Sequence, residues 1–128
     1  MRAVLSQLDA VEGPSFAAIR NSFAQGVDAL EQSVGYILAT YGPDIKSASV
    51  GSVPFLELFG IVAGGWQMAR AALVAQRRIA EGKDNAFYRT KIVTTRFYAD
   101  HVLSGAAGLA YAVINGAPGA LEIADEAF

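Results

Sequence analysis

The sequence predicts an all-α fold, an antiparallel bundle of three long helices with a short helix at the N-terminus. Apolar residues recur every three or four positions over long stretches, which is the spacing of a helix with 3.6 residues per turn. No stretch alternates between apolar and polar residues as a half-buried strand does. Hydrophobic residues make up 53% of the 128 residues, enough for one domain with a core. We therefore expect residues 1–128 to form a single helical-bundle domain.

The stretch from Val53 to Ala80 is predicted to be the central helix of this bundle. It carries no charge between Glu57 and Arg70, and two apolar stripes follow it at helical spacing. The stripes are Phe55, Phe59, Val62, Trp66, Ala69 and Leu73, and Leu58, Ile61, Gly65, Met68, Ala72 and Ala75. A helix with two stripes needs neighbours on two sides. The uncharged run is shorter than the about 20 residues of a membrane span, so we expect a buried helix and no span.

Two helices are predicted before the central one. A short amphipathic helix covers Ala3–Val11, and a long helix with one apolar face begins near Pro14 and continues to about Tyr41. Residues 44–52 are rich in serine and glycine, and we expect them to form a mobile loop. The loop leads to an N-cap of the central helix at Ser52 or Val53.

One further long helix is predicted after the central one, from about Asn85 to Asn115. The central helix ends at Glu81-Gly82, and Asp84 is the expected cap of the next helix. So short a connection makes the two helices antiparallel neighbours. Residues 117–128 are expected to be a short helix or a mobile tail.

The composition excludes several classes of function. The net charge of −2 argues against nucleic-acid binding, which needs a surplus of Lys and Arg. The absence of cysteine excludes disulfides and thiolate metal sites and favours a reducing compartment. The first residues lack the continuous apolar core of a signal peptide, so we expect a cytoplasmic protein. We predict no metal and no cofactor in this chain, because it has neither a Glu-x-x-His pair nor a P-loop.

No catalytic group stands out. His101 is the only histidine, and no G-x-S-x-G elbow accompanies it. Asp100 is its neighbour in sequence and points away from it on a helix. We interpret His101 as a half-buried helix residue with one hydrogen bond.

Glycines and one arginine in the central helix indicate close contacts. Gly60 and Gly64, with Gly65 beside them, are typical of a place where two helices approach closely, within one domain rather than between subunits. Arg70 lies in apolar surroundings and is expected to form an ion pair with Asp100 or Glu31. An interface or an anion contact is the alternative for Arg70.

The aromatic residues exceed what three helices and a short fourth can cover, although most of them are expected in the core. We therefore predict an exposed apolar patch that a partner buries. The candidate interface residues are Phe55, Phe59, Gly64, Trp66, Arg70, Phe97, Tyr98 and His101.

Several segments also resemble a known family. They are the LFGIVAGGW segment with the basic end of its helix, the EGKDNAF connection, and the K-x-x-x-x-R-F-Y-A-D-H run from Lys91 to His101. With the helix before them they resemble the C-terminal accessory domain of acyl-CoA dehydrogenases, in the branch of the 3-methylmercaptopropionyl-CoA dehydrogenases. The resemblance covers nearly the whole chain and rests on packing patterns.

The resemblance implies an enzyme that uses FAD and a glutamate base to oxidise an acyl-CoA thioester to the 2-enoyl-CoA. The flavin site, the CoA pocket and the glutamate would lie in upstream domains, so no catalytic or flavin-binding residue is assigned to this chain. Its expected role is packing against the catalytic domains and shaping a homo-oligomer. Two alternatives stay open: a free-standing dimerising module, and a bundle that binds a lipid or acyl chain between its helices.

Overall fold

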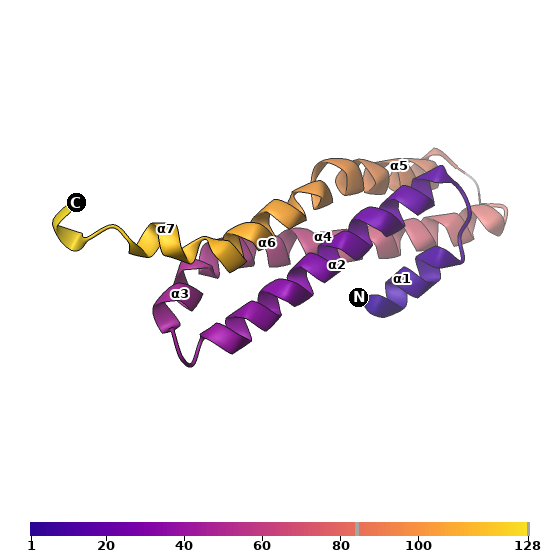
Figure 1. Cartoon of the computed structure of the whole chain (residues 1–128). Coiled ribbons are helices and arrows are strands. Elements are labelled where there is room, and N and C mark those ends of the chain that lie inside the picture. Colours follow the sequence, from indigo (N-terminus) through magenta and orange to yellow (C-terminus); the bar gives the residue numbers. More distant parts are fainter. Residues whose placement is uncertain (84, 128) are drawn as a thin grey trace.

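The computed structural model describes residues 1–83 and 85–127, and the regular elements in these residues are helices (Figure 1). In chain order they are α1 (Arg2–Asp9), α2 (Pro14–Thr40), α3 (Ile45–Val50), α4 (Ser52–Ala80), α5 (Ala86–His101), the 3₁₀ turn η1 (Leu103–Gly105), α6 (Ala106–Asn115), α7 (Ala117–Leu121) and the 3₁₀ turn η2 (Asp125–Ala127). The predicted all-α bundle is confirmed.

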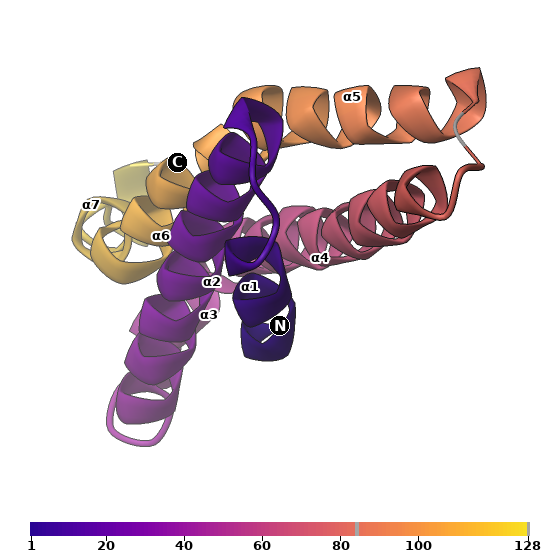
Figure 2. The same ribbon diagram turned by 90° about the vertical axis from the view of Figure 1, so that its right-hand side faces the viewer.

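The long helices lie side by side in an antiparallel arrangement. Helices α2 and α4 run in opposite directions, and α5 and α6 lead back along α4 (Figure 1). Helix α1 lies against both α2 and α4, between them in the view of Figure 2. This arrangement puts α4 in contact with α1, α2, α5 and α6, as expected for the central helix.

The core lies where the apolar faces of α1, α2, α4, α5 and α6 meet. Phe23 of α2 is fully buried, as are Leu58 and Val62 of α4. Of the two stripes predicted for α4, the second is better buried, whereas Phe59 of the first is 49% exposed. Burial of a side chain of this size stabilises the fold by roughly 1.5–3 kcal/mol. The middle of α2 and α4 is therefore the most strongly held part of the bundle.

Helix α4 is long and apolar enough to pass as a membrane span. It has 29 residues, and an 18-residue window within it has a mean hydropathy of 1.3. The short length of the uncharged run was therefore not enough to exclude a membrane span. The contacts of α4 with helices on several sides and its six buried residues instead support a core helix.

The mobile loop predicted over residues 44–52 is wrong. Residues 45–50 form α3, because Asp44 caps the helix. The backbone N–H of Ser47 donates to one carboxylate oxygen of Asp44 at 3.1 Å, and the Ser47 hydroxyl donates to the other at 2.6 Å. Ala48 of α3 is buried, and Gly51 precedes α4 as its N-cap in place of Ser52 or Val53.

Replacing Asp44 with alanine should therefore loosen α3. The bonds from Ser47 hold the pKa of Asp44 below its usual range. A lowered pKa means that the capping stabilisation is present above about pH 4 and is lost as the pH falls through the pKa of the folded state. Amide hydrogen exchange at Ser47 and Ala48 should be faster in Asp44→Ala. Asp44→Asn should keep the protection and lose its pH dependence, since asparagine also caps helices. Equal exchange in all three proteins would contradict the role of the cap.

The last long helix is not continuous as predicted. Helix α5 ends at His101, η1 follows at Leu103–Gly105, and α6 begins at Ala106. Leu103 is buried there and reaches the positions of Gly26 on α2 and Gly65 on α4. The break lets one leucine fill the space between these two helices, at a point where Ser104 and the glycines nearby favour helix formation only weakly.

The ends of this region also differ in detail. Asn85 caps α5 by accepting a hydrogen bond from the backbone N–H of Tyr88 at 3.3 Å. The predicted cap, Asp84, lies outside the described residues. In the C-terminal segment, α7 is a short helix whose Ala117 is buried, in agreement with one of the two forms predicted for it.

Candidate interaction surfaces

The charged side chains form ion pairs that join helices at the surface. Arg2 of α1 contacts Asp28 at 3.0 Å and Glu31 at 2.5 Å, both on α2. Arg96 and Asp100 pair within α5 at 2.5 Å. In the described residues no group of three His, Asp or Glu side chains is placed to hold a metal ion. The ion pairs of Arg2 join α1 to α2, whereas the Arg96–Asp100 pair lies within α5.

Arg70 does not form the predicted ion pair. Asp100 is paired with Arg96 and Glu31 with Arg2, so both expected partners are taken by closer cations. Arg70 is exposed, its guanidinium lies 5.2 Å from the centre of the Trp66 ring, and it donates to the side chain of Gln67 at 3.0 Å. A cation over an indole contributes about 0.5–1 kcal/mol at an exposed site.

His101 is exposed, contrary to the half-buried position predicted for it. Its ring lies against that of Phe97, with 4.3 Å between the ring centres and an angle of 33° between the planes. Both residues are exposed and lie four positions apart, which puts them on the same side of α5. The pair lies on the outer side of α5.

Gly64 and Gly65 are where α4 is approached most closely, as predicted. The Tyr98 hydroxyl donates to the backbone oxygen of Ile61 at 3.0 Å and occupies the space beside Gly64. Burial raises the pKa of Tyr98. Leu103 fills the space beside Gly65, whereas nothing lies within 4 Å of a Cβ atom built on Gly60. The side chains that approach Gly64 and Gly65 both belong to this chain and not to a second subunit.

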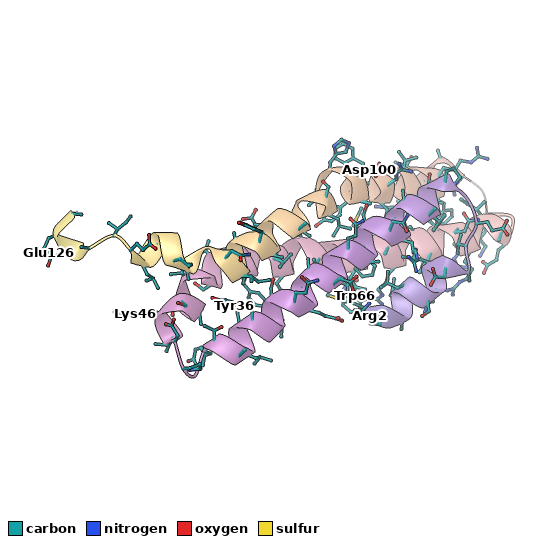
Figure 3. All side chains as sticks on the ribbon, viewed as in Figure 1. Arg2, Tyr36, Lys46, Trp66, Asp100 and Glu126 are labelled. Carbon is teal, nitrogen blue, oxygen red and sulfur yellow. The ribbon has the colours of Figure 1, made fainter. Side chains whose placement is uncertain are left out.

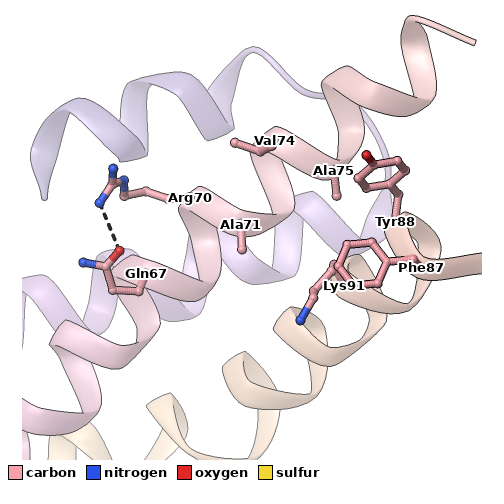
Figure 4. Close-up of a pocket in the computed structure, with 8 residues that line it drawn as sticks. All are labelled: Gln67, Arg70, Ala71, Val74, Ala75, Phe87, Tyr88 and Lys91. Carbon is pink, nitrogen blue, oxygen red and sulfur yellow. Dashed lines mark hydrogen bonds between the residues drawn. The ribbon is translucent and has the colours of Figure 1, made fainter. Parts of the chain in front are cut away.

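An open groove between α4 and α5 forms the first candidate surface (Figure 4). This α4–α5 groove has a volume of about 400 Å³ and is lined by Gln67, Arg70, Ala71, Val74, Ala75, Phe87, Tyr88 and Lys91. Val74 is 48% exposed and Phe87 is 62% exposed. In Figure 4, Arg70 and Gln67 lie at one end and Phe87 and Tyr88 at the other.

The α4–α5 groove combines an apolar floor with two cations. Lys91 lies with its ammonium 5.2 Å from the centre of the Phe87 ring. Among the described residues neither Arg70 nor Lys91 has a carboxylate partner. This arrangement suits an apolar side chain accompanied by an acidic group, because a carboxylate would complement the cations and the rings would cover the apolar part.

A second candidate surface lies between α2 and α4, beyond the end of α1. We define it by Tyr41 of α2 and Phe55 of α4, and Val34, Leu38 and Phe59 are further exposed apolar residues on the same two helices. Leu38 is 76% exposed and Tyr41 is 61% exposed. Part of it is a hollow of about 240 Å³ in which Tyr41 and Phe55 meet α3. In Figure 3, Tyr36 marks this part of α2, away from Arg2 and Trp66 near the N-terminus of α1.

The eight predicted interface residues therefore do not form one patch. Phe55 and Trp66 of α4 pack against the core, whereas Phe59 is exposed. The others are dispersed as described above: Gly64 and Tyr98 within the α4–α5 contact, Phe97 and His101 on the outside of α5, and Arg70 over Trp66.

Helical spacing puts Val34 and Tyr41 on the apolar face of α2, yet both residues are exposed. Helix length was the available signal. At 1.5 Å per residue, an eight-residue α1 is about 12 Å long and cannot cover a 27-residue α2 of about 40 Å. Val74 and Lys91 were also not predicted as surface-site residues, because the sequence does not show where α4 and α5 separate and leave a groove between them.

Comparison with known proteins shows which family the chain resembles. The family described as "Acetyl-CoA dehydrogenase C-terminal like" matches residues 1–124. A 3-methylmercaptopropionyl-CoA dehydrogenase from Ruegeria pomeroyi is 42% identical over 87 residues, which are 68% of this chain and 14% of that protein. The chain thus spans a small part of the length of this relative. The match over almost all residues shows that the chain belongs to the acetyl-CoA dehydrogenase C-terminal-like family, as its sequence motifs predicted.

Proposed function

We propose that this chain is the accessory C-terminal domain of an FAD-dependent, cytoplasmic acyl-CoA dehydrogenase that converts an acyl-CoA to the 2-enoyl-CoA. Its role is to pack against the catalytic region of that enzyme and to contribute to a homo-oligomer. Family membership and the similarity to a CoA-ester dehydrogenase support the assignment.

The described residues of this chain do not fit a flavin. The closely spaced glycines Gly60, Gly64 and Gly65 lie inside α4, so their backbone N–H groups are used within the helix and do not form a phosphate-binding loop. The flavin, the acyl-CoA and the catalytic glutamate would therefore belong to the upstream region, and no catalytic step is assigned to a residue of this chain.

The α4–α5 groove is the observation that best supports the proposed packing against the catalytic region. Exposed apolar residues gathered in a groove with charges at its edge are typical of surfaces that bind another protein. Phe87 and Val74 offer the apolar contact, and Arg70 and Lys91 are available for acidic groups. We therefore place the contact with the catalytic region at this groove.

Binding of this chain to the separately produced catalytic region of its parent enzyme tests the proposal. Phe87→Ala should weaken binding at least tenfold by calorimetry, which corresponds to about 1.4 kcal/mol, because it removes a large exposed apolar side chain from the groove. Phe97→Ala is the matched control, since Phe97 is 60% exposed on the same helix and outside the groove. A loss of binding in Phe97→Ala alone would place the contact on the outside of α5.

Light scattering of this chain over a concentration series, alone and mixed with the catalytic region, separates the proposal from the alternative of a free-standing dimerising module. The proposal expects the chain to bind the catalytic region whatever its own oligomeric state. A stable dimer that does not bind the catalytic region would contradict the proposed accessory domain and support the free-standing dimerising module.

A further inference from the structure

Residues 121–126, which we call the acidic segment, lie outside the packed part of the bundle. The segment begins at the last residue of α7, which contacts α3 and α6, and in Figure 1 it extends away from the other helices. Leu121 is 46% exposed and Ile123 is 50% exposed. Glu122 and Glu126 are exposed as well, and among the described residues neither carboxylate has a cation as its partner. The segment therefore presents both apolar and acidic side chains to solvent.

The α4–α5 groove has the complementary properties. Val74 and Phe87 provide exposed apolar surface, and Arg70 and Lys91 are cations without a carboxylate partner in the described part of the chain. Burial of aliphatic side chains in such a groove would supply most of the affinity, and the two cations would select an acidic partner and align it. The acidic segment matches the groove in both respects.

The acidic segment cannot reach the groove of its own chain. A Cβ atom built on Gly51 would lie 3.1 Å from the backbone oxygen of Val113, so the start of α4 lies beside the end of α6, from which α7 and the segment follow. At 1.5 Å per residue, Val74 in the groove lies about 33 Å along α4 from Ser52. Residues 122–126 span at most about 18 Å even when fully extended. A segment of this sequence that fills the groove must therefore come from a second copy.

We propose that the acidic segment of one copy of this chain docks in the α4–α5 groove of a second copy. The glutamates of the segment meet the two cations of the groove, and its aliphatic side chains lie against the apolar floor. Two copies that lie side by side in opposite directions can exchange segments, which closes the assembly at a dimer. This self-association goes beyond the proposed function and does not depend on it.

One consequence of the contact does rest on the proposed function. The catalytic region is placed at the same groove, so a groove that holds the acidic segment is closed to that region. The segment then inhibits docking, and the catalytic region has to displace it.

Charge reversal on either side of the contact tests the pairing in residues 1–128. Sedimentation of the unchanged chain at concentrations up to about 1 mM should show a monomer–dimer equilibrium. Arg70→Glu with Lys91→Glu should raise the dissociation constant at least tenfold, because the groove then repels the glutamates. Glu122→Lys with Glu126→Lys should do the same from the other side. All four residues are exposed, so the fold should tolerate the changes.

A mixture of the two charge variants tests whether these sites meet each other. The altered groove and the altered segment again have opposite charges, as do the two unaltered sites. The mixture should therefore associate to within about threefold of the unchanged chain, although neither variant does so alone. Lys46→Glu with Arg77→Glu is the control, because it changes the net charge as much as the groove variant does at exposed sites outside the groove. This control should leave the association unchanged.

Three results would overturn the inference: a chain that stays monomeric over the whole series, an association that responds to neither charge variant, or a mixture that stays monomeric. The proposed function is tested separately. The variant with Glu122→Lys and Glu126→Lys has an unchanged groove and lacks the competing segment. Its binding to the catalytic region, measured with and without Phe87→Ala, therefore shows whether that region docks in the groove, whatever the self-association of the chain.

Discussion

Replacing Phe23 with alanine is expected to lower the free energy of unfolding by about 3–5 kcal/mol, the largest effect of any single substitution considered for this chain. The Phe23 ring is fully buried in the middle of α2, among residues of the core cluster formed with α1, α4, α5 and α6. Removing it takes away the transfer free energy of the ring and leaves a cavity, because neighbouring helices relax only in part.

Urea denaturation followed by circular dichroism measures this loss. Phe97→Ala is the control of the same chemistry at an exposed site and should change the free energy of unfolding by no more than about 0.5 kcal/mol. In a protein of this size a loss of 3–5 kcal/mol lowers the melting temperature by roughly 10–20 °C. Similar effects of the two substitutions would mean that the core does not lie where the structure places it.

Replacing Gly65 with valine is expected to be the second largest change, a loss of about 1–3 kcal/mol. A Cβ atom at Gly65 would lie 2.8 Å from both methyl carbons of Leu103, which is itself buried and has no free space to move into. The added methyl groups of valine would enlarge the overlap.

Gly60→Ala is the matched control on the same helix and should raise the free energy of unfolding, whereas Gly65→Val lowers it. Nothing lies within 4 Å of a Cβ atom there, so alanine should stabilise the chain by about 0.5–1 kcal/mol through its better helix propensity. The double variant Gly65→Val with Leu103→Ala should lose less than the sum of the single variants, since the two side chains compete for one space. Additive losses would show that Gly65 and Leu103 do not share it.

Most of the fold could be predicted because the helices follow the spacing of apolar residues and the breaks follow Gly and Pro. The limits of α2 and α4 are within two residues of those predicted. The break between α5 and α6 was missed for a physical reason. The buried residues Ala99, Leu103, Ala106 and Ala110 keep steps of three and four across the break, so the spacing of apolar residues gave no signal of the 3₁₀ turn.

The surfaces were harder to predict than the core. Arg96 and Asp100 are four apart on one helix, so their pairing was readable from sequence and would have left Arg70 without that partner. Coverage of one helix by another depends on where each begins and ends in space. Helical spacing alone therefore puts Val34 and Tyr41 on the apolar face of α2, although both are exposed and the eight-residue α1 is too short to cover the whole of that face.

The position of Leu103 also bears on the order in which the chain assembles. Leu103, from the last third of the chain, contacts the positions of both Gly26 on α2 and Gly65 on α4. A chain made from its N-terminus presents both glycines well before that leucine. The packing between α2 and α4 is therefore incomplete during synthesis. It is completed only after the turn between α5 and α6, which carries Leu103, has been made.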